Sequence, residues 1–238
     1  MHAMILAAGY GKRLRPLTDT VPKPLVDMGG RPLLDHTLLR VAALGIRRVV
    51  INVHHLAEQI IAHVGDGSAY GLDVIWSQET VLMETGGGVC QALGLLGEAP
   101  FLAINGDVVW DMDLEPLITA FDPIRMDGLL GLVPVRGEEA GGGDFVVDDR
   151  GRLRRAGSGN GGWIYSGLQM LRPSALRDYP AEPFSLNRFY DDAMGRERLY
   201  GLPLEGFWAD IGTPERLDIT RLEWKNRFAI GAGLAYKD

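Results

Sequence analysis

The sequence predicts an α/β fold in which helices flank a mixed, mostly parallel sheet. Segments of β type alternate with segments of helical period, a pattern typical of βαβ units. Several apolar runs stop abruptly at glycines or acids, as buried strands do where they reach the edge of a sheet. With 238 residues, the chain is long enough to form one large α/β domain without a disulfide or a metal to hold it together.

Residues 1–135 are expected to form the regular part of this fold. Apolar or alternating runs predict strands at 4–8, 48–53, 72–77, 100–107 and 128–135. Helical spacing predicts helices at 31–45, 56–64, 89–96 and 114–121. In the first helix, Leu34, Leu38 and Val41 share one face, and Gly45 suits the end of the helix.

The pattern becomes less regular after residue 135. Glycine runs at 141–143 and 157–162 predict loops, and residues 144–155 predict a hairpin that turns at 149–151. A strand is expected at 163–171. We expect residues 136–207 to form an inserted lobe docked on the sheet, within a single domain that spans residues 1–238.

Residues 208–238 are expected to close the domain with a strand and a helix. Thr213 suits the N-cap of a helix over 214–227, and Pro214 suits its first position. Leu217 and Trp224 lie on one side of this helix. Because the apolar stripe is incomplete, we expect the helix to be only partly buried.

Composition limits the partners and the compartment. A formal net charge of −7 argues against nucleic acid or an anionic membrane as a partner, since both require a basic face. Cys90 is the only cysteine, so no disulfide can form within the chain, and a cytoplasmic protein is expected. Cys90 itself is expected to be a small buried residue on a helix rather than a nucleophile.

The first two dozen residues contain a candidate anion site. A short apolar run ends at Gly9 and Gly11, and the cations Lys12, Arg13, Arg15 and Lys23 follow. Glycines let backbone N–H groups approach an oxyanion closely, and Lys and Arg add charge-assisted hydrogen bonds to phosphate. The segment fits neither the dinucleotide nor the Walker fingerprint, because Leu14 and Arg13 stand where a glycine and a serine or threonine would be needed. We interpret it as a polyphosphate-binding loop.

Two acids are candidate ligands of Mg²⁺. Asp107 follows an apolar strand, and Asp210 follows an apolar-aromatic run just before a helix start, so both are expected at the edge of the sheet. Mg²⁺ takes one or two carboxylates together with substrate phosphates and water. Other acids, namely Asp111, Asp113, Asp191 and Asp192, are expected in solvated turns.

The remaining signals are weaker. The glycines at 86–88 lie in a predicted loop at 79–88, where bare backbone would allow a nucleobase or ribose to approach closely. His54 and His55 are adjacent in sequence and so face different ways, and the chain has no zinc-binding spacing. It also has no Gly-x-Ser-x-Gly elbow.

The motifs together resemble the sugar-1-phosphate nucleotidylyltransferase family. The resemblance covers the signature Leu-Ala-Ala-Gly-x-Gly-x-Arg-Leu-x-Pro-Leu-Thr and the later Pro-Lys-Pro-Leu, at residues 6–25, and continues at 84–88, 105–108 and 208–217. It implies a Rossmann-like fold of the nucleotide-diphospho-sugar transferase type with an inserted sugar-binding lobe. Lys12 departs from the threonine that many relatives have there.

The resemblance also implies roles for individual residues. Arg13 and Lys23 would contact substrate phosphates as catalytic residues, and Asp107 and Asp210 would bind Mg²⁺. The expected nucleotide-binding residues are Leu6, Ala7, Ala8, Gly9, Gly11, Lys12, Arg13, Glu84, Thr85, Gly86, Gly87 and Asn105. The expected sugar-binding residues are Asn105, Asp144, Tyr165, Ser166 and Gly167.

The implied partners are a nucleoside triphosphate and a sugar 1-phosphate, with the protein a monomer or small homo-oligomer. Within the family, the short branch implies UTP and N-acetylmuramate 1-phosphate. The alternative is guanylyl transfer to mannose 1-phosphate, because the phosphate motifs are shared. A non-catalytic nucleotide-sugar sensor on the same fold is a further alternative, although a sensor need not keep two metal-binding acids.

Overall fold

The structure is a computed structural model that describes residues 1–135, 142–157 and 162–230, with side chains described as far as residue 227. Its strands are β1 (Ala3–Leu6), β2 (Arg48–Val53), β3 (Asp73–Gln78), β4 (Phe101–Asn105), β5 (Val108–Trp110), β6 (Gly128–Pro134), β7 (Phe145–Val147), β8 (Leu153–Arg155), β9 (Trp163–Leu171), β10 (Leu199–Pro203) and β11 (Trp208–Asp210). Its α-helices are α1 (Leu33–Ala43), α2 (Ala57–Val64), α3 (Glu84–Leu96), α4 (Glu115–Ala120), α5 (Leu186–Gly195) and α6 (Pro214–Ile230).

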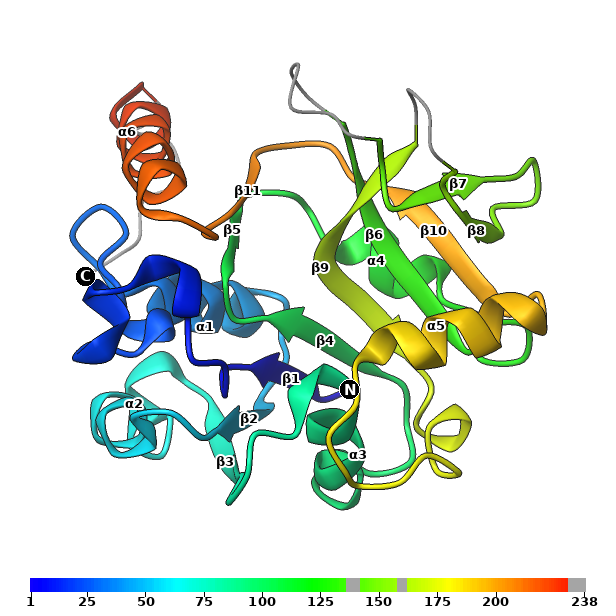
Figure 1. Cartoon of the computed structure of the whole chain (residues 1–238), viewed down its shortest axis with the longest axis horizontal. Coiled ribbons are helices and arrows are strands. Elements are labelled where there is room, and N and C mark those ends of the chain that lie inside the picture. The colour runs from blue at the N-terminus through cyan, green and yellow to red at the C-terminus, as the bar shows by residue number, and fades with distance from the viewer. Residues whose placement is uncertain (136–141, 158–161, 231–238) are drawn as a thin grey trace.

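One large sheet runs through the molecule in the strand order β10-β6-β9-β4-β1-β2-β3 (Figure 1). The pairs β1–β2, β1–β4, β2–β3 and β6–β10 are parallel. Strand β9 is antiparallel to both β4 and β6. The prediction of an α/β fold with a mixed, mostly parallel sheet is therefore confirmed.

Helices cover both faces of this sheet, which explains why its central strands are apolar on both sides. One core cluster joins the sheet to α1, α2 and α4 through residues such as Leu38, Ile60 and Leu117. A second cluster joins the opposite face to α3 and α5, for example through Val89 and Phe189. None of the helices in the described ranges is long and apolar enough to cross a membrane.

Most of the predicted elements are present, and three elements were not predicted. Strands β2 and β9 have the predicted bounds. Strands β5 and β10 and helix α5 were not predicted. Of the glycine runs at 141–143 and 157–162, residue 141 and residues 158–161 lie outside the described residues.

The described part of residues 136–207, the segment predicted to form a lobe docked on the sheet, contributes strands to the sheet itself. Strand β9 lies between β4 and β6, and β10 forms the end of the same sheet. In this described part, the hairpin of β7 and β8 lies off the main strand path, and it confirms the hairpin predicted at 144–155.

A small second sheet pairs β5 with β11 in antiparallel register. Helix α6 follows β11 directly, and Thr213 Oγ1 accepts a hydrogen bond from the N–H of Arg216, as expected of an N-cap. Leu217 and Trp224 of this helix are buried, whereas Ile219 and Leu222 are exposed. The prediction of a partly buried closing helix is confirmed.

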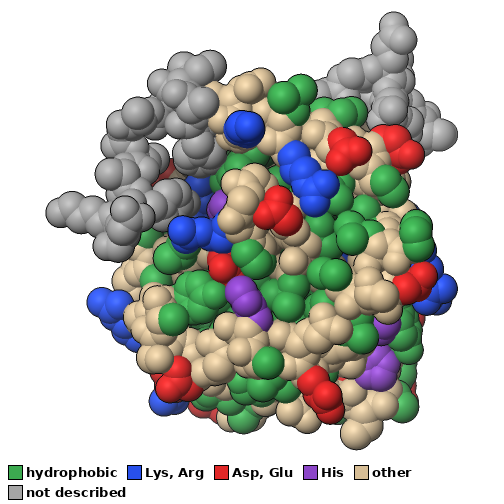
Figure 2. All heavy atoms as spheres, turned by 90° about the vertical axis from the view of Figure 1, so that its left-hand side faces the viewer, with side chains coloured by type: hydrophobic (Ala, Val, Ile, Leu, Met, Phe, Trp, Pro, Cys, Tyr) green, Lys and Arg blue, Asp and Glu red, His purple; other side chains and the backbone are tan. Residues whose placement is uncertain are grey.

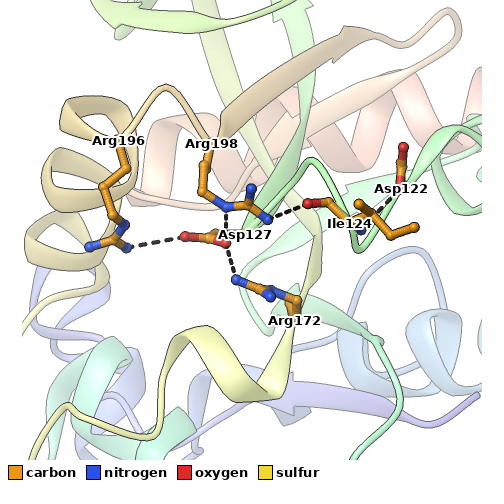
Figure 3. Close-up of polar contacts among 6 residues, drawn as sticks. All are labelled: Asp122, Ile124, Asp127, Arg172, Arg196 and Arg198. Carbon is orange, nitrogen blue, oxygen red and sulfur yellow. Dashed lines mark hydrogen bonds and ion pairs between the residues drawn. The ribbon is translucent and has the colours of Figure 1, made fainter.

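A buried carboxylate ties together three strands at one end of the sheet. Asp127 precedes β6, and its side chain is only 3% exposed. It accepts hydrogen bonds from Arg172 after β9, from Arg196 at 3.2 Å and from Arg198 before β10 at 2.7 Å (Figure 3). Burial alone would raise the pKa of Asp127, but the hydrogen bonds and charges of Arg198 and Arg172 outweigh it and lower that pKa.

We expect Asp127→Asn to lower the free energy of unfolding at pH 7 by about 3 kcal/mol, because the arginines lose the charge that they surround. The guanidinium groups keep partial contact with water, so the effect belongs at the low end for a broken buried pair. Since the folded pKa is lowered, the stabilising contribution exists above the unfolded pKa of about 3.9 and disappears as the pH falls through the folded value.

Urea unfolding of the wild type and the variant at several pH values tests this expectation. The difference between them should shrink below about pH 4. Asp73→Asn serves as the control, because the Asp73–Arg48 pair is exposed and should change stability by about 0.5 kcal/mol or less. Equal effects of the two substitutions at pH 7 would contradict the assignment.

Candidate active site

The loop after β1 begins at the point where the strand order of the sheet reverses. Strand β1 lies between β4 and β2, so the chain moves from β1 to one side and later returns to the other. In open α/β sheets, ligands bind at the carboxyl ends of the strands at this point. Gly11 has φ of +62°, and a side chain there would press against Thr18 and Lys23. Glycine is therefore required to fold the loop back on itself.

A cavity of about 340 Å³ lies at this edge of the sheet. Its lining residues come from the ends of β1, β2 and β4, from the start of α3 and from the residue before α5. They are Leu6, Ala7, Ala8, Gly9, Lys23, Pro24, Asn52, Leu82, Glu84, Thr85, Asn105, Gly106, Asp107 and Ser185. Most of the predicted nucleotide-binding residues are thus brought to one place.

A second, smaller cavity of about 230 Å³ shares Gly9, Lys23 and Asp107 with the first. It adds Lys12, Arg13 and Gly212 to the lining. Within the described ranges, neither Lys12 nor Arg13 has an ion-pair partner, whereas Arg15 pairs with Asp19 at 3.0 Å on the surface. Arg15 lines neither cavity.

The positive charge at the cavity is local. Seen from the side that carries α2 and α6, basic and acidic side chains are interspersed rather than gathered into one basic patch (Figure 2). The chain as a whole has a formal net charge of −7. Attraction of an anion at this edge therefore depends on the few cations of the β1 loop and not on a broad basic face.

Lys23 and Asp107 meet directly. The Nζ of Lys23 donates to Oδ2 of Asp107 at 2.8 Å, and the Lys23 side chain is 12% exposed. Gly106 brings the carboxylate into place, because its N–H donates to Leu6 O at 2.8 Å and a side chain there would collide with that oxygen. The Asn-Gly-Asp sequence thus turns tightly over the end of β1.

The pairing of β5 with β11 brings Asp210 to the same edge. Asp210 is opposite Val108 in this pairing, and the N–H of Ile211 donates to Asp107 O at 2.8 Å. Asp210 forms an ion pair with Arg216 of α6. A side chain built on Gly212 would lie 3.1 Å from both Arg13 Nη1 and Asp210 Oδ2, so the guanidinium and the carboxylate flank this glycine.

The donor set at this edge suits Mg²⁺. Asp107 and Asp210 are hard oxygen donors whose side chains are 37% and 28% exposed. Among the described residues there is no cluster of three or more acidic, histidine or cysteine side chains that would form a complete protein cage for a metal. Two carboxylates beside a basic loop fit an ion that takes its other ligands from phosphates and water.

The glycines at 86–88 do not form a loop. Helix α3 begins at Glu84, so residues 84–88 are its first turns, and the predicted loop was too long. The N–H groups of Gly86 and Gly87 both donate to Phe184 O, at 2.8 and 3.2 Å, and neither glycine lines the cavity. A side chain on Gly86 would overlap Phe184, and one on Gly87 would overlap Glu182 O. The glycines make room for the protein's own chain.

We expect Gly87→Ala to destabilise the fold, because the new methyl group would overlap backbone at Glu182. By the range for overpacking, the loss should be about 1–3 kcal/mol. Gly94→Ala in the same helix is the matched control, since it meets nothing within 4 Å and should stabilise by about 0.5–1 kcal/mol. Thermal unfolding of both variants would measure the difference, and equal shifts would refute the role of Gly87 in packing.

The predicted sugar-binding residues are only partly brought together. Ser166 is fully buried and donates its hydroxyl hydrogen to Gly131 O at 2.7 Å, so it is a packing residue in this structure. Gly167 packs against Asn105, which lines the cavity. Oδ2 of Asp144 accepts a hydrogen bond from the Tyr165 N–H at 2.9 Å, and neither of these residues lines the cavity.

The Tyr165 hydroxyl is buried, and burial together with Tyr190 and the Asp107 charge raises its pKa well above the usual value. The phenol therefore stays neutral. Tyr165 does not line the cavity.

Several lining residues were missed by the sequence analysis. Asn52 ends the apolar run of β2, and its Oδ1 accepts a hydrogen bond from the Ala7 N–H at 2.8 Å. A polar residue at the end of an apolar strand is a signal that could have identified it. Leu82 and Ser185 lie in irregular segments and carry no such signal.

Other predictions about single residues can be compared with the structure. Cys90 is buried in α3, and burial raises its pKa to about 11, in agreement with a structural role. The prediction that four acids lie in solvated turns was wrong for Asp191 and Asp192, which lie in helix α5. Each of the four has a partner: Asp111 pairs with Arg227, Asp113 accepts a hydrogen bond from the N–H of Glu115, Asp191 pairs with Arg155, and Asp192 accepts from Tyr179.

Comparison with known proteins identifies the family of this chain. The model of the family described as Nucleotidyl transferase matches residues 2–155, more than half of the chain. The chain belongs to this family. The matched range contains the β1 loop, the cavity residues from β2 and β4, and Asp107.

Individual relatives of this nucleotidyl transferase are similar over almost their full length. The N-acetylmuramate alpha-1-phosphate uridylyltransferase of Neisseria meningitidis is 40% identical over 91% of this chain and 95% of its own length. The protein of the same name from Caulobacter vibrioides is 36% identical over 90% of this chain and 92% of its own length. Both support a nucleotidyltransferase of the sugar-1-phosphate type.

A solved structure agrees with the fold. HddC from Yersinia pseudotuberculosis, determined in complex with GMP-PN, superimposes with a TM-score of 0.78. The two are 25% identical, and the match covers 94% of this chain and 99% of the other.

Proposed function

We propose that the protein transfers a uridylyl group from UTP to N-acetylmuramate 1-phosphate, giving UDP-N-acetylmuramate and pyrophosphate. One structural observation supports this proposal above all. The Lys23–Asp107 pair and the cations Lys12 and Arg13 line two cavities that share residues at the carboxyl edge of β1 and β4, and Asp210 lies beside Gly212 in the lining of the smaller one. The two uridylyltransferase relatives support the choice of substrates.

The chemistry requires little acid–base help. The nucleophile is a phosphate oxygen of the sugar 1-phosphate, which is already ionised near neutral pH. It attacks the α-phosphorus in line, the bond from that phosphorus to the oxygen bridging to the β-phosphate breaks, and pyrophosphate leaves with the electron pair. No general base is needed, so the task of the protein is to hold the two anions in line and to balance their charge.

The residues divide this work by position. Arg13 and Lys12 lie in the glycine loop and would bind the triphosphate, while backbone N–H groups near Gly9 and Gly11 add further donors. Lys23, held by Asp107, would bind a phosphate oxygen between the two cavities. The larger cavity would hold the nucleoside between the end of β1 and the start of α3, beside Glu84 and Thr85.

Asp107 and Asp210 would hold Mg²⁺, which supplies charge neutralisation to the phosphates when bound. Lys23 already occupies Oδ2 of Asp107, and the second oxygen has no hydrogen-bond partner among the described residues. Arg216 forms an ion pair with Oδ1 of Asp210 and thereby fixes that carboxylate. A reaction that consumes a nucleoside triphosphate belongs where these are made, which agrees with the predicted cytoplasmic location.

Pyrophosphate release from a matrix of nucleoside triphosphates and sugar 1-phosphates, with Mg²⁺ present, tests the proposal. We expect turnover with UTP and N-acetylmuramate 1-phosphate to exceed turnover with GTP and mannose 1-phosphate. The reverse order would establish guanylyl transfer instead. Nucleotide binding without turnover of any pair would indicate a sensor and refute the enzyme.

Replacement of Arg13 tests the phosphate role directly. Arg13→Met should lower kcat/KM by about 10²–10³-fold, the loss typical of one preorganised donor to a developing charge. Arg15→Met is the matched control, because Arg15 follows two residues later, pairs only with Asp19 among the described residues and should leave kcat/KM within about twofold. Steady-state kinetics of both variants measures the difference. Equal losses of kcat/KM in the two variants would contradict the phosphate-binding role of Arg13.

A further inference from the structure

Two adjacent histidines in the connection between β2 and α2 contact the glycine loop. His54 Nδ1 lies 2.9 Å from Glu79 O, and its Nε2 lies 3.1 Å from the hydroxyl of Tyr10. Because a carbonyl oxygen can only accept, Nδ1 must carry a hydrogen. In the neutral ring, Nε2 is then an acceptor, and the Tyr10 hydroxyl donates to it.

His55 forms a hydrogen bond with a second point of the loop. Its Nε2 lies 3.0 Å from Thr18 O and must therefore donate to it. Thr18 is fully buried, and its hydroxyl donates to Gly11 O at 2.9 Å. His55 is thus connected through Thr18 to the glycine that turns the loop.

Both histidine rings also pack against the Tyr10 ring, with centroid distances of 5.5 Å for His54 and 5.2 Å for His55. The Nζ of Lys12 lies 5.5 Å from the centroid of the same ring, on its face. Tyr10 stands between Gly9 and Gly11 in the sequence. The Tyr10 side chain therefore holds this glycine-rich turn against the two histidines.

We propose that His54 and His55 are positioning residues that fix residues 9–18 in the shape that presents Lys12 and Arg13 to a triphosphate. This inference rests on the proposed function and deepens it. Two glycines make the loop costly to order, and Lys12 and Arg13 lack ion-pair partners within the described ranges, although Arg15 pairs with Asp19. Hydrogen bonds made in the free protein order the loop before the nucleotide binds, so less conformational entropy is lost on binding.

A purely structural role for the two histidines predicts a different result. If they only stabilise the fold, their loss lowers the unfolding temperature and leaves KM for the nucleotide unchanged. If they position the loop, KM for the nucleoside triphosphate rises while KM for the sugar 1-phosphate does not. A third possibility, a metal site, lacks support, because no third ligand lies near them among the described residues.

Tyr10→Phe and His55→Leu test the two contacts separately. Each should raise KM for the triphosphate about 3–10-fold, the ratio that corresponds to one neutral hydrogen bond. His55→Gln should restore most of the loss, because its amide nitrogen lies close to the position of Nε2 and can donate to Thr18 O. Tyr70→Phe is the matched control, since Tyr70 donates to Asp35 at 2.9 Å and does not contact the loop.

The outcomes separate this inference from the proposed function. If the wild type turns over its substrates and Tyr10→Phe and His55→Leu have the kinetics of Tyr70→Phe, the positioning role is wrong and the function stands. If the wild type turns over no substrate pair, the proposed function fails, and calorimetric binding of tripolyphosphate decides the inference alone. The same 3–10-fold weakening is then expected, and equal affinities of the variants and wild type would overturn it.

Discussion

The ion pair between Lys23 and Asp107 is the contact on which the candidate site depends. It joins residues 84 positions apart in the sequence, one from the loop after β1 and one from the turn after β4. The hydrogen bond from Gly106 to Leu6 holds the two strand ends together beneath it. Because Lys23 is largely buried, salt screens this pair less than it screens the exposed Lys12 and Arg13. The buried pair therefore fixes the centre of the site, and the exposed cations remain available to an anion.

Much of the fold could be predicted because its strands are long and apolar. Strand β2 buries five of its six residues and strand β9 buries six of its nine, so their apolar composition indicates their bounds. Helix α5 was also predictable, since Leu186, Phe189 and Ala193 have helical spacing and Ser185 caps the start; its omission was an error. The three-residue strand β5 is different, because a segment that short has no periodicity and its partner β11 lies about a hundred residues away. No local signal could have revealed that pairing, although it is what brings Asp210 to Asp107.

In the candidate site, too, some residues could be predicted from local sequence and others depend on partners far away in the sequence. The β1 loop and Asp107 were recognisable because glycines followed by cations, and an acid at the end of a strand, are uncommon away from anion and metal sites. The glycines of α3 could make room either for a ligand or for the chain itself, and local sequence does not separate these two roles. Phe184 and Glu182, about a hundred residues further on, fill that room. Ser166 likewise faces Gly131 of a neighbouring strand rather than a sugar, a partner that depends on the bulge between β6 and β9.

Strand β9 has a consequence for how the chain is made. It separates β4 from β6, yet it is synthesised after both. While the ribosome is still adding residues up to 171, β4 and β6 therefore present unpaired edges, which in nascent chains invite association with other strands. Strand β9 fills the position between them in antiparallel orientation, and β10, which pairs with the other edge of β6, is synthesised later still. Burial of these exposed edges therefore depends on the synthesis of a later segment, and not on the completion of β4 and β6 themselves.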